Sequence, residues 1–425
     1  MKKSLRAFLF LAVALLVVGC TAPGGGGPSS TPNRGGSTTS TGGLEYVFTP
    51  DTTNAGLDNS DWPLYFFGLA YGNGTYVAVG TLGTVLTSTD GTDWYVRENN
   101  YNNDRSIAKS KHTIPGRPVQ ARTLVGARKT LGLGSTGKSI PVGRALINNG
   151  YRSDIWDDLI GVAYGAGKFV AIGYNNDAWS SPDGTSWTPI DLSAQSLYDF
   201  ESIAFLNGKF VAFGYGESGC VVLTSGDGSS WSSTTLSNGD FYAGAAYGIG
   251  VYVAVTWSES NSSIYTSANG SGWTAVSNGS ISLPASYYGE GLNIELTSVA
   301  FHDGVFVAVG TAWNNSLDKN VPLILVSTDG INWSSQDLPD LTPPGLGTAN
   351  AYLTGIAATD AGFVAVGDFY MQGDGSSPFA ASIVLTSTTG RSWQHDYYNS
   401  SLSGAVVSGN GISAVGLGDN LFDWY

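Results

Sequence analysis

Residues 299–310, VAFHDGVFVAVG, and residues 327–333, STDGINW, together decide the fold of this 425-residue chain. In the first stretch, two short apolar runs flank a glycine-containing turn, the pattern of two antiparallel strands joined as a hairpin. In the second stretch, the end of an apolar strand is followed by a tight turn and a tryptophan. The pair predicts a unit of four short antiparallel strands, which we name A to D in chain order.

Both stretches recur along the chain. Copies of the hairpin occupy residues 69–80, 162–173, 203–214, 245–256, 299–310 and 356–367, with a worn copy at 406–416. Copies of the turn occupy 88–94, 181–187, 225–231, 267–273, 327–333 and 387–393. One four-stranded sheet of this size cannot bury both of its faces, so the copies must stack, and radial stacking gives a β-propeller. We therefore expect an all-β propeller of seven four-stranded antiparallel blades, with six to eight allowed; the worn hairpin and residues 44–48 would build the last blade.

The Ser-x-Asp-Gly-x-x-Trp turns resemble the Asp-box, or BNR, repeat of sialidase-like propellers, with one residue fewer between Asp and Gly than in the usual box. The resemblance covers residues 64–416 and implies structural roles, in which Ser and Asp close the turn and the aromatic side chain packs between blades. The residues to which it assigns these roles are Asp90, Trp94, Asp183, Trp187, Asp227, Trp231, Trp273, Asp329, Trp333 and Trp393.

The N-terminal residues indicate export. Residues 1–19 combine a basic start with an apolar run too short for a membrane span, as in a signal peptide. Residues 17–20, Val-Val-Gly-Cys, resemble the lipobox of bacterial lipoproteins, which implies that Cys20 is acylated and anchors the chain to a membrane. Residues 20–43 then form a flexible linker rich in Gly, Ser and Thr, and residues 44–425 are expected to be a single propeller in the cell envelope or at the cell surface. Whether the membrane is the inner or the outer one stays open.

An aperiodic segment, residues 95–152, interrupts the repeats. It holds 11 of the 19 Lys and Arg residues of the chain against two acids, whereas the chain as a whole has a net charge of −14. Residues 132–139, GLGSTGKS, match the pattern of a phosphate-binding loop, but Ile140-Pro141-Val142-Gly143 follows where such a loop requires a helix. We therefore expect no nucleotide ligand. Three interpretations of the segment stay open: a loop that folds back on the acidic propeller, a patch that binds an anionic surface, and a degenerate or frame-shifted blade.

Catalytic signatures are weak. As the resemblance implies, sialidases hold their substrate with three arginines, and outside residues 95–152 the propeller body has only Arg391, so we do not expect sialidase activity. The three histidines (His112, His302 and His395) share no metal-binding spacing, and Cys220 lies in an apolar run, so no catalytic residue, metal or cofactor is assigned. Because acids are plentiful, a glycan-active hydrolase with two carboxylates stays the alternative function.

One face of the ring is the expected binding face. In an up-and-down blade the A–B and C–D turns lie on one face, and the B–C and D–A connections lie on the other. The long inserts fall on the second face: residues 278–295, 311–320, 336–352 and 368–380. Inserts confined to one face of a repeat protein commonly mark its binding surface.

Aromatic side chains recur near the end of strand B on that face. The candidate ligand-binding residues are Tyr174, Tyr215, Trp257, Tyr287, Tyr288, Trp313 and Tyr370, with Phe369 beside the last. Acids next to them are Asp177, Glu217, Glu259, Asp318 and Asp368. Aromatic rings edged by carboxylates suit stacking on sugars or the capture of a cationic peptide, although the same rings can simply pack strand ends. The sequence thus predicts a binding module for a glycan or for an envelope or extracellular protein, with nucleic acid not expected as a partner.

Overall fold

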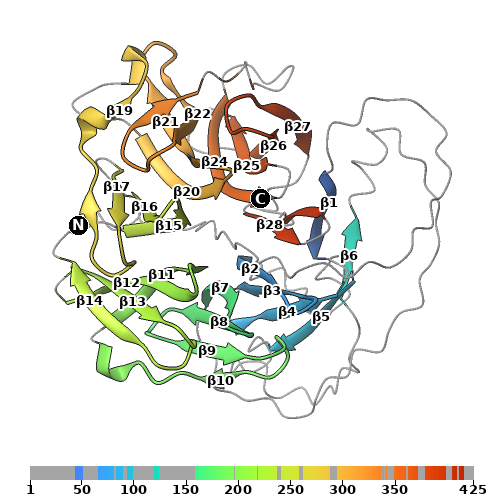
Figure 1. Cartoon of the computed structure of the whole chain (residues 1–425). Helices are drawn as coiled ribbons and strands as arrows, with labels where there is room; N and C mark the ends of the chain where they lie inside the picture. Colours follow the sequence, from blue (N-terminus) through green and yellow to red (C-terminus); the bar gives the residue numbers. More distant parts are fainter. Residues whose placement is uncertain are drawn as a thin grey trace, which may run out of the picture.

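The computed structural model shows sheets arranged in a ring around a central axis (Figure 1). It describes residues 44–50, 66–80, 83–89, 93–98, 119–123, 158–195, 197–217, 219–236, 241–257, 262–287, 294–336, 338, 341, 349–359, 362–371, 379–398, 404–408 and 411–415. The signal peptide, Cys20 and the linker predicted from the sequence therefore lie outside the described residues, as do most of residues 95–152.

Six sheets make up the described ring, and each contains one repeat unit with its strands in the order A to D. Blade 1 is β2 (Phe66–Gly72), β3 (Thr75–Gly80), β4 (Val85–Ser88) and β5 (Asp93–Glu98). Blade 2 is β7 (Leu159–Gly165), β8 (Lys168–Gly173), β9 (Ala178–Ser181) and β10 (Thr188–Pro189), followed by the 3-10 helix η4 (Ser193–Gln195). Blade 3 is β11 (Leu197–Leu206), β12 (Lys209–Gly216), β13 (Gly219–Ser225) and β14 (Ser232–Leu236).

The second half of the ring repeats this plan. Blade 4 is β15 (Phe241–Gly248), β16 (Val251–Trp257), β17 (Ile264–Ser267) and β18 (Thr274–Ala275). Blade 5 is β20 (Ile294–His302), β21 (Val305–Asn314), β22 (Lys319–Ser327) and β23 (Trp333–Ser335), and before it come η5 (Asn278–Ser280), β19 (Ile281–Ser282) and η6 (Ala285–Tyr287). Blade 6 is β24 (Ala349–Thr359), β25 (Gly362–Met371), β26 (Phe379–Ser387) and β27 (Gln394–Tyr398). This closed ring of radial antiparallel sheets is a β-propeller.

The ring closes differently from the prediction. The described residues form six blades rather than seven, because the strands expected to build a separate seventh blade hydrogen-bond into the sheet of blade 1. That sheet continues from β5 through β6 (Val119–Thr123), β1 (Leu44–Pro50) and β29 (Gly411–Val415) to β28 (Gly404–Ser408). β1 pairs in parallel with β29, so the two end regions of the described chain do meet. β28 contacts β24 on one side and β2 on the other, between blade 6 and blade 1 (Figure 1).

The A–B turns explain the recurring glycine. In blade 2, Ala166 and Gly167 have φ angles of 48° and 76°, and five of the six blades show two such consecutive positive angles. Two consecutive residues in the left-handed region form the type I′ turn, whose twist matches that of the flanking strands. Glycine adopts this conformation at little cost, whereas Ala166 does so against its preference.

The C–D turns are closed by side chains, as blade 2 shows. Ser181 Oγ accepts a hydrogen bond from the N–H of Gly184 over 2.8 Å. Asp183 Oδ1 accepts from the N–H groups of Thr185 and Ser186 over 2.8 and 3.2 Å. The indole N–H of Trp187 donates to the carbonyl oxygen of Gly184 over 3.1 Å. These bonds satisfy backbone groups that the tight turn would otherwise leave without partners.

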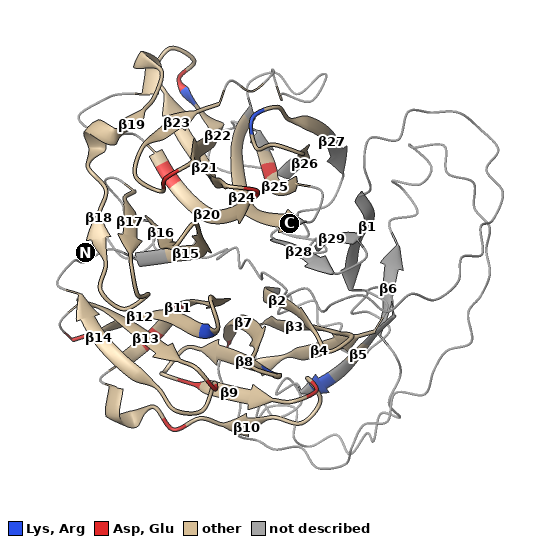
Figure 2. Ribbon diagram, in the orientation of Figure 1, with Lys and Arg blue, Asp and Glu red and all other residues tan. Residues whose placement is uncertain are grey.

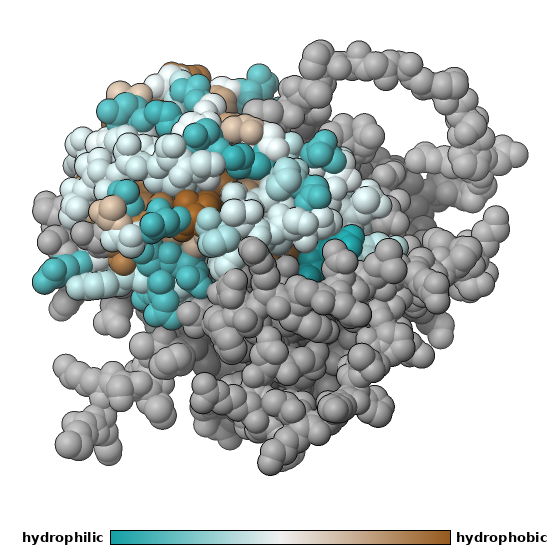
Figure 3. Space-filling view, turned by 90° about the horizontal axis from the view of Figure 1, so that it is seen from below, coloured by the Kyte–Doolittle hydropathy of each residue, from teal (hydrophilic) through white to brown (hydrophobic). Residues whose placement is uncertain are grey.

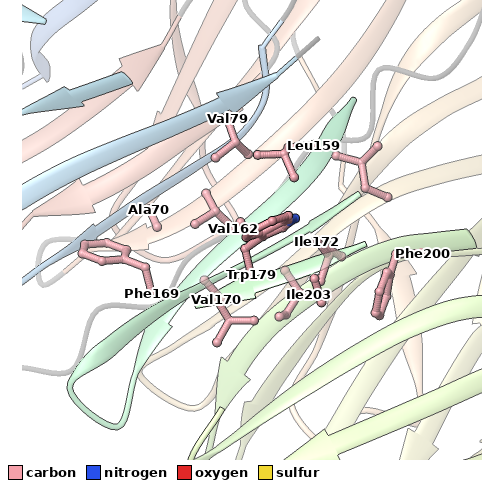
Figure 4. Packing of buried hydrophobic residues seen from close by; sticks show 14 of the residues in the cluster. Ala70, Val79, Leu159, Val162, Phe169, Val170, Ile172, Trp179, Phe200 and Ile203 are labelled. Atoms are coloured by element: carbon pink, nitrogen blue, oxygen red, sulfur yellow. The ribbon is translucent and has the colours of Figure 1, made fainter. Parts of the chain in front are cut away.

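Packing between neighbouring blades holds the ring together. Trp179 of blade 2 lies among aliphatic side chains of both its neighbours, such as Val79 and Ile203 (Figure 4). Hydrogen bonds add to this packing, since Thr297 Oγ1 of blade 5 donates to the carbonyl oxygen of Leu353 in blade 6 over 2.8 Å. Thr297 lies at an irregularity of strand A that recurs in all six blades and bends the inner strand.

Hydrogen bonds between blades also show which connections share a face. Lys168, at the A–B turn of blade 2, donates through Nζ to Ser229 Oγ in the C–D turn of blade 3 over 3.0 Å. On the opposite face, the N–H of Asn175 in the B–C loop of blade 2 donates to Asp199 Oδ1 near the start of blade 3 over 2.8 Å. We name the face with the A–B and C–D turns the turn face, and the face with the B–C and D–A connections the loop face.

One predicted insert differs from expectation. Residues 311–320 are not a free loop, because β21 runs to Asn314 and β22 begins at Lys319, which leaves a turn of four residues at the tip of a longer hairpin. The N–H of Asp318 donates to the carbonyl oxygen of Asn314 over 2.9 Å within that turn.

Candidate functional site

Two tyrosines of blade 3 form an exposed aromatic pair on the loop face. Tyr198 lies at the start of β11 and Tyr215 near the end of β12, with ring centroids 6.5 Å apart and ring planes inclined by 49°. Among the side chains that the structure describes, they are the two exposed aromatic ones, with exposed fractions of 53% and 40%. Large exposed rings of this kind are typical of binding surfaces because they offer apolar area with little conformational freedom to lose.

The strand register explains why Tyr198 lies there. Across the β11–β12 ladder, Leu197 is opposite Gly216 and Asp199 is opposite Tyr215, so Tyr198 has no partner residue in the register. Such an irregularity re-aims the side chain that it displaces. The ring of Tyr198 thereby reaches the ring of Tyr215 on the neighbouring strand.

The B–C loop of blade 2 borders the pair and is held in shape by its backbone. The N–H of Gly173 donates to the carbonyl oxygen of Asp177 over 2.8 Å. The N–H of Asp177 donates to the carbonyl oxygen of Tyr174 over 3.1 Å. Asn175 and Asn176 have φ angles of 56° and 63°, a left-handed conformation that asparagine tolerates better than most residues. A loop fixed in this way loses little entropy when a partner binds.

Carboxylates surround the loop and the tyrosine pair. Asp199 accepts the N–H of Asn175, and Asp158 provides the carbonyl oxygen that accepts the N–H of Tyr174 over 3.2 Å. Burial, followed by the negative charges of Asp158 and Asp199, raises the pKa of Tyr174 to about 12. Tyr174 therefore keeps its proton at physiological pH, and both carboxylates lie near enough to act on it.

The remaining sequence candidates do not join this group. Tyr287 and Trp313 lie half-buried around blade 5, where the N–H of Asn315 donates to the carbonyl oxygen of Ser286 over 2.9 Å. Trp257 ends β16 and Tyr370 lies in β25, but their side chains lie outside the described part, as does all of Tyr288. The structure therefore brings Tyr174 and Tyr215 to one blade boundary, and Tyr287 and Trp313 to another.

Two candidates near the end of β25 are corrected. Phe369 and Asp368 have exposed fractions of 2% and 3%, so neither belongs to an open surface. Phe369 packs in the apolar cluster shared by blades 5 and 6. Among the neighbouring acids, Glu259 lies outside the described residues.

Charge divides unequally between the two faces. Figure 2 marks the Lys, Arg, Asp and Glu residues of the ring. Among the described side chains, two basic residues lie next to a connection of the loop face: Lys319 at the start of β22 and Arg97 near the end of β5, whose Nε donates to Thr87 Oγ1 over 2.7 Å. The acids there are Asp158, Asp177, Asp191, Asp199, Glu217, Glu295 and Asp318. The described turn face is more balanced: it carries Asp183, Asp227, Asp303 and Asp329 beside Lys168, Lys209 and Arg391. The loop face therefore favours cationic partners.

On the side seen in Figure 3 the described surface is mostly hydrophilic to neutral, with a hydrophobic patch among these residues. Of its depressions, one is enclosed by residues of β11, β12 and β15 and another lies at the C–D turn of blade 4, and neither is lined by Asp or Glu. Within the same residues, no three His, Cys, Asp or Glu side chains are grouped as metal ligands would be, and no helix is both long and apolar enough to cross a bilayer.

Three residues of the site escaped the sequence analysis. Tyr198, Asp199 and Asp158 all come just before or at the start of strand A, where the repeats differ from one another. The available signal was the pair Tyr198-Asp199, which follows a D–A connection and places an aromatic residue beside an acid at the start of the strand. The aromatic residue that recurs from unit to unit lies instead near the end of strand B.

Comparison with known proteins gives matches at the level of fold. The sequence matches no family model and no curated protein. The solved structure of YCF48 bound to D1 peptide is 16% identical, covers 78% of this chain and 81% of its own, and has a TM-score of 0.42. PorZ, a surface component of the type-IX secretion system of Porphyromonas gingivalis, is 10% identical over 85% of this chain and 39% of its own, with a TM-score of 0.41.

A third similar structure is the WD40 β-propeller domain of Doa1. It is 11% identical, covers 84% of this chain and 90% of its own, and has a TM-score of 0.43. The shared feature is the β-propeller. Since propellers carry unrelated functions, the site and not the fold must support a function for this chain.

Proposed function

We propose that this protein is an exported, membrane-anchored propeller that binds a partner in the cell envelope through its loop face. The observation that carries the proposal is the exposed Tyr198–Tyr215 pair beside Asp199, on the face with seven described acids and two described bases. An exposed aromatic pair in a charged rim is the composition of an interaction surface. The partner class is a protein or a glycan.

The sequence supports the location in the same proposal. Residues 1–19 act as the signal peptide, Cys20 carries the lipid, and residues 20–43 are the tether. A Gly- and Ser-rich tether of this length has a root-mean-square reach of about 25 Å, so the propeller can turn its loop face away from the bilayer. Residues 44–425 form one domain, and the repeat turns are relatives of the Asp-box that serve the fold.

The proposal is tested by screening the purified protein against a glycan array and a peptide array. A Tyr198→Ala/Tyr215→Ala variant is screened beside it, with a Tyr287→Ala variant as a control because Tyr287 is half-buried at another blade boundary. Saturable binding that the double substitution abolishes supports the loop face as the binding surface. A ligand whose binding survives the double substitution, or a folded protein that binds nothing on either array, overturns this assignment.

A further inference from the structure

We propose that Tyr198, Tyr215 and Asp199 form a subsite for the ammonium or guanidinium group of a lysine or arginine side chain in a partner protein. This inference rests on the proposed function and names the chemistry of its ligand. Three features of the loop face support it: the geometry of the rings, the sign of the surrounding charge and the rigidity of the neighbouring loop.

The geometry of the rings fits a compact cation. With centroids 6.5 Å apart and planes inclined by 49°, the two rings form an open wedge and not a continuous flat platform. A cation placed in the wedge lies within about 6 Å of both ring centroids, the range in which the ring quadrupole attracts a positive charge. A pyranose ring stacks best on a flat aromatic surface. Because the two rings are inclined to each other, they do not form one continuous flat surface for a sugar.

The surrounding charge selects the same ligand class. Asp199 lies next to Tyr198 in the chain and opposite Tyr215 in the ladder, and Glu217 follows Tyr215 by two residues. Asp158 acts electrostatically on Tyr174 together with Asp199, so it belongs to the same group of carboxylates. These charges attract cations and repel acidic sugars. At the loop-face end of this blade boundary no described Lys or Arg lies near enough in the chain to pair with a ligand carboxylate, because Lys168 and Lys209 lie on the turn face.

The rigidity of the B–C loop of blade 2 completes the subsite. The N–H group of Asn175 in this loop donates to Asp199 Oδ1 over 2.8 Å and so restrains the carboxylate of the residue that lies next to Tyr198 in the chain and opposite Tyr215 in the ladder. The carboxylate retains further lone pairs that can accept from an ammonium or guanidinium group. The subsite is therefore preorganised, although it is shallow and lies on an open surface.

The experiment uses the full chain in detergent and saturation-transfer difference NMR, which detects weak ligands. The probes are acetyl-tetralysine amide and acetyl-tetraarginine amide, the same tetralysine peptide with its side chains acetylated, and the neutral sugar chitotetraose. We expect the two cationic peptides to bind and the acetylated peptide and the sugar not to bind. The binding should weaken as salt rises from about 50 to 500 mM, because exposed charges are screened.

Variants separate the subsite from general attraction to an acidic protein. Tyr198→Ala/Tyr215→Ala should weaken binding of tetralysine about 4- to 25-fold, since each exposed ring contributes roughly two- to fivefold. Asp199→Asn should weaken binding of tetralysine about two- to fivefold. The amide oxygen of the substituted side chain can still accept the N–H of Asn175. Tyr215→Phe should bind like the parent protein because the ring is kept. Asp303→Asn is the charge control, because Asp303 lies in an A–B turn on the opposite face, where other blades carry Asn.

Each outcome decides between the two proposals. The subsite proposal is wrong if Asp303→Asn weakens the binding of tetralysine as much as Asp199→Asn does. It is also wrong if the double substitution does not change that binding. If chitotetraose binds and the double substitution abolishes that binding while tetralysine does not bind, the cation subsite is wrong but the loop face is still a binding surface. If no probe binds here and no array ligand depends on the tyrosine pair, both proposals fail.

Discussion

Trp273 donates its indole N–H to the carbonyl oxygen of Gly270 over 3.2 Å, which locks the C–D turn of blade 4 to the side chain that covers it. The same bond joins the tryptophan and the glycine of the turns in blades 2, 5 and 6. In blade 3 the corresponding nitrogen of Trp231 is buried and has no hydrogen-bond partner among the described residues. The repeat thus contains its own comparison between a satisfied and an unsatisfied indole.

We predict that Trp273→Phe destabilises the protein by about 1 kcal/mol more than Trp231→Phe. A neutral hydrogen bond contributes about 1 kcal/mol net, whereas removal of a buried donor without a partner relieves a desolvation cost. Both side chains are half-buried in the structure, so the losses of packing are comparable. Urea unfolding of the two variants measures the difference, and equal losses of unfolding free energy would contradict it.

Ile249 occupies an unfavourable position in the A–B turn of blade 4. Its φ angle is 46°, and the equivalent residues of blades 1 and 3 are Asn73 and Asn207, with φ angles of 49° and 48°. The left-handed conformation costs an ordinary L-residue roughly 1–2 kcal/mol, and Ile249 is 56% exposed, so little apolar burial offsets this cost.

Ile249→Asn should therefore raise the free energy of unfolding by about 1 kcal/mol. The reverse change, Asn207→Ile in blade 3, should lower it by a similar amount. Denaturant unfolding of both variants checks the pair. A loss of stability in Ile249→Asn would show that the isoleucine makes contacts that outweigh its backbone conformation.

Two glycines of blade 2 separate backbone conformation from packing between blades. Gly167 and Gly184 have φ angles of 76° and 77°, so alanine is strained equally at both positions. A Cβ at Gly167 would meet no atom within 4 Å, whereas at Gly184 it would lie 2.5 Å from Val77 Cγ2 of blade 1. We predict that Gly184→Ala costs about 1–3 kcal/mol more than Gly167→Ala, because overpacking adds to the shared strain. Equal thermal stabilities of the two variants would show that blade 1 can move away at no cost.

Stability should fall in acid, partly through Asp329. Burial raises the pKa of this carboxyl, but hydrogen bonds from Asn332, Ile331 and Ser327 outweigh it and lower the pKa to about 2. An unfolded aspartate has a pKa of about 3.9. Because the folded value is lower, the contribution of Asp329 is fully present above about pH 4 and is lost as the pH falls toward 2.

Asp329→Asn should remove this part of the pH dependence while keeping the turn. Asn269 occupies the same position in blade 4 and accepts the N–H groups of Ser271 and Gly272 over 2.9 and 3.1 Å. We expect the gap in stability between the parent and Asp329→Asn to narrow between pH 5 and pH 2. Asn269→Asp in blade 4 is the reverse control, and it should make the free energy of unfolding fall more steeply between pH 5 and pH 2. A gap that stays constant over this range would mean that the Asp329 carboxylate contributes nothing through its ionisation.

The proposed anchor depends on one atom, the thiol sulfur of Cys20. Cys20→Ser should abolish incorporation of radiolabelled palmitate and move the protein from the membrane fraction to the soluble exported fraction in a bacterial host. Cys220→Ser is the matched control, because Cys220 is buried in blade 3 and cannot be an anchor. Equal palmitate labelling of Cys20→Ser and the parent protein would contradict lipidation at this residue.

The sequence by itself determined the class of fold and the internal plan of each blade. Short apolar runs such as Val299–Phe301 and the glycine-containing turns that separate them allow few alternatives to antiparallel strands, and a unit that cannot bury its own faces must stack. Local turn chemistry was equally readable, since Ser327, Asp329 and Gly330 interact within a few residues of one another.

The tertiary structure decided what depends on contacts distant in the chain. The sequence favoured seven blades within a range of six to eight, and the described residues form six. The difference arises because β6 pairs with both β5 and β1 and so merges the end strands with the sheet of blade 1, whereas the repeats give no pattern for β6. Burial was also a tertiary outcome, since Phe369 is covered by neighbouring blades although Tyr215, at the same end of strand B, is exposed. The aromatic pair itself arises from a shift of strand register at Tyr198: the residue types place a tyrosine at the start of strand A, but only the ladder shows that its ring is aimed at Tyr215.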